Sequence, residues 1–123
     1  MVIDTSALLS ILFNEESSTK ILGVIERSTS ELFMSTVNLA ETLILVQDRQ
    51  PKAYERIRVT LKDIAIGWIA PDFEQAEIAS IARMKYPLNL GDCFAYALAK
   101  SKNDSLLTLD KDFKKTGLRI EKI

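Results

Sequence analysis

The stretch Met1-Val2-Ile3-Asp4-Thr5-Ser6 joins a strand, a carboxylate and the start of a helix. Val2 and Ile3 predict a short buried strand that ends on Asp4, and the apolar residues 7–13 predict a helix directly after it. A carboxylate between a strand and a helix stands where open α/β folds bind their ligands. Asp4 is also a common type of N-cap residue, and for Asp4 alone the two interpretations have equal weight.

The composition is that of an ordinary globular protein, with 123 residues of which 47% are hydrophobic and 27% charged. We therefore expect a single domain over residues 1–123. No apolar run approaches the ~18 residues of a membrane span. Glu15 and Glu16 interrupt the first apolar stretch, so we do not expect a signal peptide. We therefore expect a cytoplasmic location. The net charge of −1 means that nucleic-acid binding would depend on local basic patches.

Several catalytic residue types are missing from the chain. It has no histidine and one cysteine, Cys93, and its four glycines are scattered, so no glycine-rich phosphate loop can form. These facts exclude histidine-dependent nucleophilic relays and the usual zinc ligand sets. Without an organic cofactor, the chemistry must come mainly from carboxylates, hydroxyls, lysines and arginines. Clustered carboxylates suit hard cations such as Mg²⁺ or Mn²⁺.

Short apolar strands alternate with helical patterns along the whole chain. This alternation predicts an α/β fold, a three-layer α/β/α arrangement with a central, mainly parallel sheet of four to five short strands. Strands are expected at residues 2–3, 31–35, within 64–69, 105–109 and, at a sheet edge, 119–123. Helices are expected near residues 7–13, 17–26, 36–49, 53–62, after Asp72 and from Asp92 to about 102.

Four further acidic residues occupy informative positions. Glu41 lies in a helix that is apolar around most of its circumference and is therefore expected to be largely buried, so its carboxylate needs a cation or a hydrogen-bond partner. Asp92 follows Gly91 at a helix start, where an N-cap role is the strong alternative. Asp110 ends the strand at 105–109, and Asp112 follows two residues later. One of these last two is expected to belong only to a polar turn.

Taken together, these acids predict a metal-dependent hydrolytic site. The carboxyl ends of parallel strands share one edge of the sheet, so Asp4, Glu41, Asp92 and Asp110 can converge on the crevice above it. Carboxylates packed together repel one another unless one or two divalent cations bind among them. Such cations can activate water and stabilise an in-line displacement at phosphorus. The reaction this indicates is phosphodiester hydrolysis.

Four segments of the chain resemble the four motifs of the PIN-domain ribonucleases, and most closely those of the VapC-type toxins of bacterial and archaeal toxin–antitoxin pairs. The resemblance covers essentially the whole chain in the family's order and spacing. The segments are Met1-Val2-Ile3-Asp4-Thr5-Ser6-Ala7-Leu8, Asn38-Leu39-Ala40-Glu41, Leu88-Asn89-Leu90-Gly91-Asp92-Cys93-Phe94-Ala95-Tyr96-Ala97-Leu98-Ala99 and Leu106-Leu107-Thr108-Leu109-Asp110-Lys111-Asp112-Phe113.

The resemblance implies a role for each matching residue. Asp4, Glu41 and Asp92 would be the core metal ligands and catalytic acids, and Asp110 would take the fourth, more variable position, with Asp112 as its competitor. It also implies that the Ser6 hydroxyl supports the site and that Thr108 orients the fourth acid. The cofactor implied is Mg²⁺ or Mn²⁺, the substrate RNA, the assembly a homodimer, and the protein partner an inhibiting antitoxin.

Two questions stay open at this level. Five basic residues follow helical spacing, which favours a solvated helix face, with phosphate contacts to RNA as the alternative; they are Arg49, Lys52, Arg56, Arg58 and Lys62. The apolar residues at 8–13 and 39–46 are expected mostly in the core, although some could form a dimer or antitoxin groove. The alternative function is a catalytically silent module that binds RNA or protein, against which the intact set of four acids argues.

Overall fold

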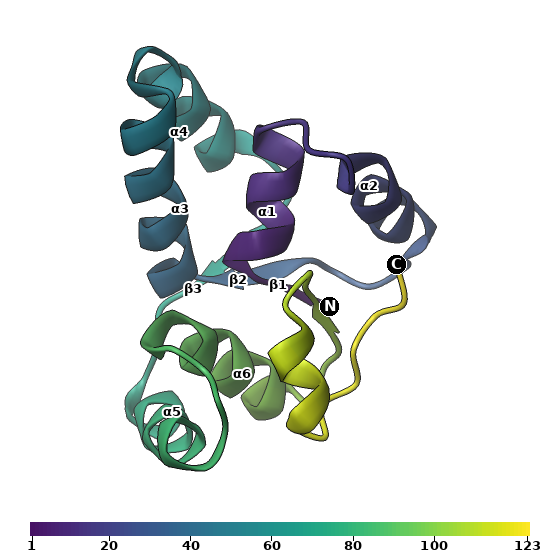
Figure 1. The fold of residues 1–123 in the computed structure, drawn as a ribbon, viewed down its shortest axis with the longest axis vertical. Coiled ribbons are helices and arrows are strands. Elements are labelled where there is room, and N and C mark those ends of the chain that lie inside the picture. The colour runs from purple at the N-terminus through teal and green to yellow at the C-terminus, as the bar shows by residue number, and fades with distance from the viewer.

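A computed structural model describes all residues from 1 to 123 and contains a central sheet of four parallel strands (Figure 1). The strand order is β3-β2-β1-β4, and each neighbouring pair is parallel. The predicted α/β fold with a mainly parallel sheet is confirmed. The strands are β1 (Val2–Ile3), β2 (Phe33–Ser35), β3 (Gly67–Ile69) and β4 (Leu106–Leu107).

Helices cover both faces of the sheet, with α1 to α4 on one side and α5 and α6 on the other (Figure 1). Two short 3₁₀ helices, η1 (Pro51–Ala53) and η2 (Lys111–Lys115), complete the structure. The α-helices are α1 (Thr5–Leu12), α2 (Ser18–Arg27), α3 (Thr36–Arg49), α4 (Tyr54–Asp63), α5 (Phe73–Lys85) and α6 (Leu90–Lys102).

The alternation of side chains along the strands creates two hydrophobic cores. Val2 and Leu106 pack with α5 and α6 on one face, whereas Ile3 and Leu107 pack with α1, α2, α3 and α4 on the other. Successive strand residues point to opposite faces, so two residues suffice to fasten β1 and β4 to both layers. All four of these side chains are fully buried.

The sheet topology places β1 and β4 side by side, with Val2 opposite Leu106 and Ile3 opposite Leu107. The chain runs outward from β1 through β2 to β3, and then returns to add β4 on the other side of β1. The order of strands therefore reverses between β1 and β4. In open parallel sheets, ligands bind at the carboxyl ends of the strands at such a reversal. Asp4 follows β1 here, and Thr108 follows β4.

The last two predicted strands are shorter than expected. The prediction of a strand over 105–109 is wrong in length, because β4 covers only Leu106–Leu107 and the Leu109 N–H donates instead to the Ser6 hydroxyl at 2.9 Å. The predicted edge strand over 119–123 is also wrong, since only an isolated parallel bridge joins Leu106 to Ile120. A two-residue β4 offers little length along which a fifth strand could pair.

The prediction that α3 is largely buried is wrong. Only Asn38, Thr42 and Val46 are buried, and they form a single stripe at four-residue spacing. Ile44, on another side of the helix, is 63% exposed. The hairpin of α3 and α4 extends away from the sheet (Figure 1), and Leu39 and Leu43 are only partly buried against the core.

Candidate active site

Asp4 is both a helix cap and part of a buried polar network. Its side chain is almost fully buried, with the residue 3% exposed. Its Oδ1 accepts hydrogen bonds from the Ala7 N–H at 3.0 Å, which caps α1, and from the Ser6 hydroxyl at 2.7 Å. Its Oδ2 accepts a hydrogen bond from the Thr108 hydroxyl. The N-cap role and the site role of Asp4 therefore do not exclude each other, since the hydrogen bond that caps α1 fixes the orientation of the carboxylate.

Ser6 and Thr108 connect the end of β1 to the end of β4. Besides donating to Asp4, the Ser6 hydroxyl accepts from the Leu109 N–H at 2.9 Å, and the Thr108 hydroxyl accepts from the Asp110 N–H at 2.9 Å. The two hydroxyls lie 3.3 Å apart. These contacts fit the supporting roles expected of both residues, because they fix the backbone that carries Asp110 relative to the carboxylate of Asp4.

Replacing Thr108 with valine should therefore weaken both the fold and the site. Valine has a similar shape but leaves Asp4 Oδ2 and the Asp110 N–H without their buried partner. We expect the free energy of unfolding to fall by about 1–3 kcal/mol, measured by chemical denaturation. RNA cleavage should fall as well. Thr108→Ser retains the hydroxyl and is the control; equal losses in both variants would show that the loss of the hydroxyl is not what weakens the Thr108→Val protein.

Glu41 is held by two residues that the sequence did not single out. Its Oε1 accepts hydrogen bonds from the Thr5 hydroxyl and from Asn38 Nδ2, both at 2.8 Å. Asn38 Nδ2 also donates to the Gly91 carbonyl at 3.0 Å, and Asn38 is 1% exposed. The available signal was spacing, since Asn38 lies three residues before Glu41 on the same helix face and Thr5 directly follows Asp4.

Gly91 provides the space that the Glu41 carboxylate occupies. A Cβ atom at position 91 would lie only 2.0 Å from Glu41 Oε2. No side chain larger than hydrogen fits there while Glu41 keeps its position. The glycine therefore permits α3 and α6 to approach each other at the site.

Asp92 lies in the first turn of α6 and is not its N-cap. The helix begins at Leu90, two residues earlier than predicted, and Asn89 is the cap. Asn89 Oδ1 accepts from the Asp92 N–H at 2.8 Å, and Asp92 Oδ2 accepts from the Asn89 N–H at 3.2 Å. This reciprocal capping box orients the Asp92 carboxylate at the positive end of the helix.

The charges of the four acids act on one another. Burial raises the pKa of Asp92 to about 6, the Asn89 N–H opposes this rise, and the carboxylates of Asp110, Asp4 and Glu41 add to it. The pKa of Asp4 is also raised, mainly by burial and to a smaller extent by Asp110. The structure thus brings Asp4, Glu41 and Asp110 close enough to Asp92 for mutual repulsion, which a bound cation would relieve.

Asp110 is better placed than Asp112 to be the fourth acid. Asp110 does not end β4 directly; it caps η2, with its Oδ1 accepting from the Asp112 N–H at 2.9 Å. Its charge acts on both Asp4 and Asp92. Asp112 instead forms an ion pair with Lys115, with 3.6 Å between Oδ1 and Nζ. We therefore expect Asp112 to be the polar-turn residue.

The two acids can be separated by matched substitutions. We expect Asp110→Asn to lower the rate of RNA cleavage by at least about tenfold, because it removes a charge that faces the other acids. Asp112→Asn should leave the rate within about twofold, since surface ion pairs contribute little. Initial rates on one RNA substrate check this prediction. The reverse order of effects would assign the fourth position to Asp112.

Comparison with known proteins identifies the family. The PIN domain family model matches residues 1–118. The chain belongs to this family. It is 35% identical to a protein named Ribonuclease VapC from Mycolicibacterium smegmatis, over 96% of this chain and 97% of that relative. The predicted membership among VapC-type PIN-domain proteins is confirmed.

Solved structures show the same PIN fold. VapC20 from Mycobacterium tuberculosis, described as a Sarcin-Ricin loop cleaving toxin, superposes with a TM-score of 0.84 at 15% identity, covering 99% of this chain and 98% of that one. A chain of a toxin–antitoxin complex from Klebsiella pneumoniae gives a TM-score of 0.79 at 21% identity, covering 98% and 95%. In this PIN fold, no helix is long and apolar enough to span a membrane.

The acids of this PIN domain fit a hard divalent cation, on which VapC ribonucleases generally depend. Three carboxylate oxygens receive no hydrogen bond from the protein, namely Glu41 Oε2, Asp92 Oδ1 and Asp110 Oδ2. An all-oxygen donor set suits such cations. As the side chains stand in this structure, no group of three acidic or cysteine side chains could hold a metal ion by itself. Water would therefore have to complete the coordination, as is usual for Mg²⁺.

The structure does not bring all of the predicted RNA-contacting residues to the acids. Lys52 and Arg56 are exposed near the turn between α3 and α4. Arg49 follows Glu41 by eight residues on α3, about 12 Å along the helix axis, and lies over the Phe13 ring at 5.2 Å. Arg58 pairs with Glu55. The proposed contact of these residues with RNA stays a prediction.

Proposed function

We propose that Asp4, Glu41, Asp92 and Asp110 hold a divalent cation and hydrolyse phosphodiester bonds of RNA, within a single PIN-like nuclease domain formed by residues 1–123. The observation that carries this proposal is the hydrogen bonding at the strand reversal between β1 and β4, where Asn38 joins Glu41 to Gly91, next to Asp92, and Thr108 joins Asp4 to Asp110. The relatives named as ribonucleases support an RNA-cleaving hydrolase. The all-oxygen donors favour Mg²⁺ or Mn²⁺ as the ion.

In the proposed site, some residues would hold the cation and others orient the residues that hold it. When bound, the cation supplies electrostatic stabilisation for the charge that develops on the phosphate. Thr5 and Asn38 hold the Glu41 carboxylate by one oxygen and leave the other available. Ser6 and Thr108 fix the orientation of the Asp4 carboxylate through hydrogen bonds to both of its oxygens. This preorganisation matters because acids already in place need no rearrangement when substrate binds.

We further propose that the protein is the toxin of a type II toxin–antitoxin pair and binds an antitoxin protein. The support is the identity with a VapC ribonuclease. A cavity of about 270 Å³ between α3 and α4 offers a binding surface, with apolar walls and the basic residues Arg58 and Lys62 at its edge. Its apolar residues are Leu39, Leu43, Leu61 and Trp68. A partner helix with apolar and acidic residues would fit this surface.

We also propose a homodimer that uses α5. Three large apolar side chains project from one side of this helix at helical spacing, Phe73 (81% exposed), Ile81 (66%) and Met84 (89%). Exposed apolar patches of this kind mark association surfaces. A cytoplasmic location remains part of the same proposal, because the partner and the RNA substrate of a toxin are found there.

The experiment is cleavage of single-stranded and structured RNA by the purified protein with Mg²⁺, Mn²⁺ or EDTA. We expect cleavage with either ion and none with EDTA. Binding of the ion should also raise the melting temperature, since a ligand at about 100 times its Kd stabilises a fold by about 2.7 kcal/mol. Undiminished cleavage in EDTA would contradict the metal site. Antitoxin binding without cleavage of any RNA would favour the silent binding module.

A further inference from the structure

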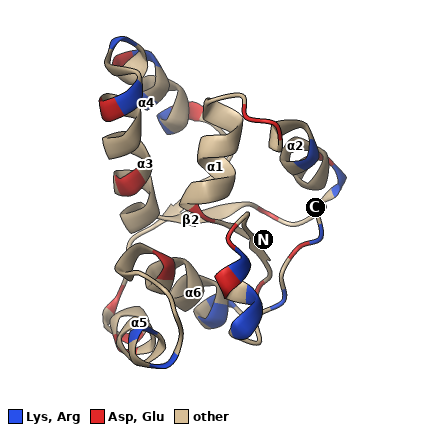
Figure 2. Cartoon of the chain, viewed as in Figure 1, with Lys and Arg blue, Asp and Glu red and all other residues tan.

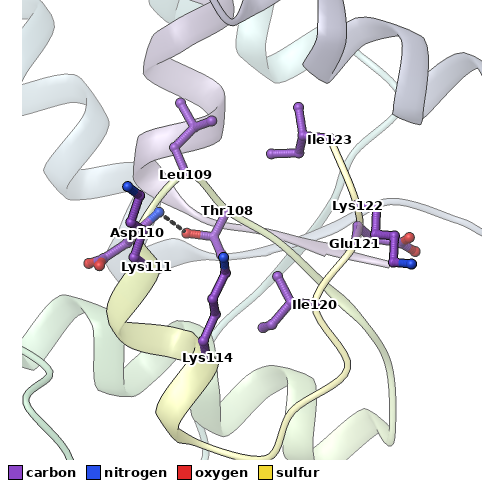
Figure 3. Close-up of a pocket in the computed structure, with 9 residues that line it drawn as sticks. All are labelled: Thr108, Leu109, Asp110, Lys111, Lys114, Ile120, Glu121, Lys122 and Ile123. Atoms are coloured by element: carbon purple, nitrogen blue, oxygen red, sulfur yellow. Dashed lines mark hydrogen bonds between the residues drawn. The ribbon is translucent and has the colours of Figure 1, made fainter.

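A cavity of about 600 Å³ opens beside the acidic site (Figure 3). Thr108 and Asp110, which belong to the hydrogen-bond network of the site, also line this cavity. The space is within the range of 300–1,000 Å³ typical of small-ligand sites. A molecule bound there would therefore lie against Thr108 and against Asp110, one of the four proposed catalytic acids.

Three lysines surround the cavity, and none of them forms an ion pair. Lys111 and Lys114 come from η2, and Lys122 comes from the C-terminal segment on the other side (Figure 3). The acidic residue Glu121 also lines the cavity, and one of its carboxylate oxygens accepts a hydrogen bond from the Ser105 hydroxyl at 2.9 Å. The cavity thus presents unpaired ammonium groups next to the acids (Figure 2 shows both charge types on this part of the chain).

The remaining surface of the cavity is apolar. Leu109 and Ile120 contribute to its lining. Ile120 is held there by its bridge to Leu106 in β4, so this wall is anchored to the sheet. An apolar wall together with flexible ammonium groups matches a nucleotide, which combines a flat base and a ribose with an anionic phosphate.

We propose that this cavity binds a nucleotide of the RNA substrate adjacent to the scissile bond, with its phosphate contacting Lys111 and Lys114 and its sugar or base packing on Leu109 and Ile120. The proposal rests on the proposed ribonuclease activity and specifies how the substrate strand continues from the acids. Since a carboxylate cluster repels the phosphates next to the scissile one, a neighbouring cationic surface compensates for that repulsion. The strand then follows η2, not the basic residues of the α3–α4 hairpin.

The test measures RNA binding without cleavage. Asp92→Asn serves as the parent protein, and fluorescence anisotropy reports the binding of a short single-stranded RNA over a range of salt concentrations. Lys111→Gln with Lys114→Gln should reduce the salt dependence of log Kd by about 1.4, that is, about 0.7 for each phosphate that a lysine no longer neutralises. This corresponds to about 25-fold weaker binding at about 0.1 M salt.

The control removes the same number of charges elsewhere. Lys20 on α2 and Lys85 on α5 are exposed and lie outside the cavity. Lys20→Gln with Lys85→Gln should leave the affinity and the salt dependence at the parent values. In the cleaving protein, the Lys111 and Lys114 changes should raise the RNA concentration for half-maximal rate far more than they lower the limiting rate.

Three outcomes would overturn the proposal. One is unchanged affinity and salt dependence after the Lys111 and Lys114 changes. Another is an equal loss with the control pair, which would indicate a general charge effect. A third is unchanged RNA binding with weakened antitoxin binding, which would assign the cavity to a protein partner. In each case cleavage by the unmodified protein would still stand, whereas failure of the unmodified protein to cleave RNA would contradict the proposed function itself.

Discussion

Replacing Asp92 with asparagine should lower the rate of RNA cleavage by at least about 100- to 1,000-fold while preserving the fold. Asp92 is the acid on which the charges of Asp4, Glu41 and Asp110 all act. Asparagine removes the charge that would hold a cation, but it keeps an oxygen that can accept the hydrogen bond from the Asn89 N–H. The cap of α6 therefore survives, and the loss should appear in catalysis.

The same variant should change how stability depends on pH in the absence of metal. Because the pKa of Asp92 is raised from 3.8 to about 6, the folded protein holds this proton more tightly than the unfolded chain does. Stability should therefore fall as pH rises from about 4 to about 6. The raised pKa of Asp4 acts in the same direction. In Asp92→Asn the decrease should be smaller, and near pH 7 the variant should melt at or above the temperature of the unmodified protein.

Melting curves in EDTA between pH 4 and pH 7.5, together with initial cleavage rates, check this prediction. Asp48→Asn is a suitable control, since Asp48 is an exposed carboxylate on α3 outside the site. It should alter neither the cleavage rate nor the shape of the pH dependence. Full cleavage by Asp92→Asn would contradict the proposed mechanism. A large fall in its melting temperature would show instead that Asp92 is mainly a structural residue.

The position of Asp4 was predictable from local sequence, whereas Glu41 was singled out through an expected burial of α3 that the structure does not show. Asp4 comes after two apolar residues and before a helix, and strand ends in a parallel sheet share an edge. The order of the strands then brings Asp110 near Asp4. The residues that orient the acids were harder to predict from the sequence. Thr5 and Asn38 are ordinary helix residues until the helices are placed, and their hydrogen bonds join α1, α3 and α6.

The short length of β4 has its physical cause in competition between side-chain hydroxyls and a neighbouring strand for backbone N–H groups. The Ser6 hydroxyl accepts a hydrogen bond from the Leu109 N–H, and the Thr108 hydroxyl accepts one from the Asp110 N–H. These N–H groups are then not available to a neighbouring strand, so β4 ends early. Strand propensity cannot register such long-range partners. The partial exposure of α3 was not predictable from its apolar content, since composition alone does not say which apolar residues find a place in the core.

Replacing Gly91 with alanine should lower the cleavage rate by about 100-fold and leave stability nearly unchanged. The added Cβ would overlap Glu41 Oε2, at 2.0 Å. The Glu41 carboxylate is the end of a flexible side chain, so it can move aside without displacing the backbone. In moving it would give up its hydrogen bonds from Thr5 and Asn38. The loss of these hydrogen bonds lowers the free energy of unfolding, and the better helix propensity of alanine, about 1 kcal/mol, offsets that loss.

Gly23→Ala on α2 is the matched control for this substitution. Its Cβ would meet only the exposed guanidinium of Arg27, at 3.0 Å from Nη1, which can swing away. We expect this variant to keep full activity and to gain about 0.5–1 kcal/mol of stability. Cleavage rates and denaturation curves of both variants, measured side by side, separate the effect of helix propensity from that of the displaced acid.

A double-variant cycle identifies Glu41 as the residue through which Gly91 acts. If Gly91→Ala works by displacing the Glu41 carboxylate, then adding it to Glu41→Gln should cost little further activity, because the charge that it displaces is already gone. Independent, multiplying losses in the double variant would mean that Gly91 serves the site in another way, for example through the Asn38 contact to its carbonyl. The close approach of α3 to α6 would then be a packing requirement and not a device for placing an acid.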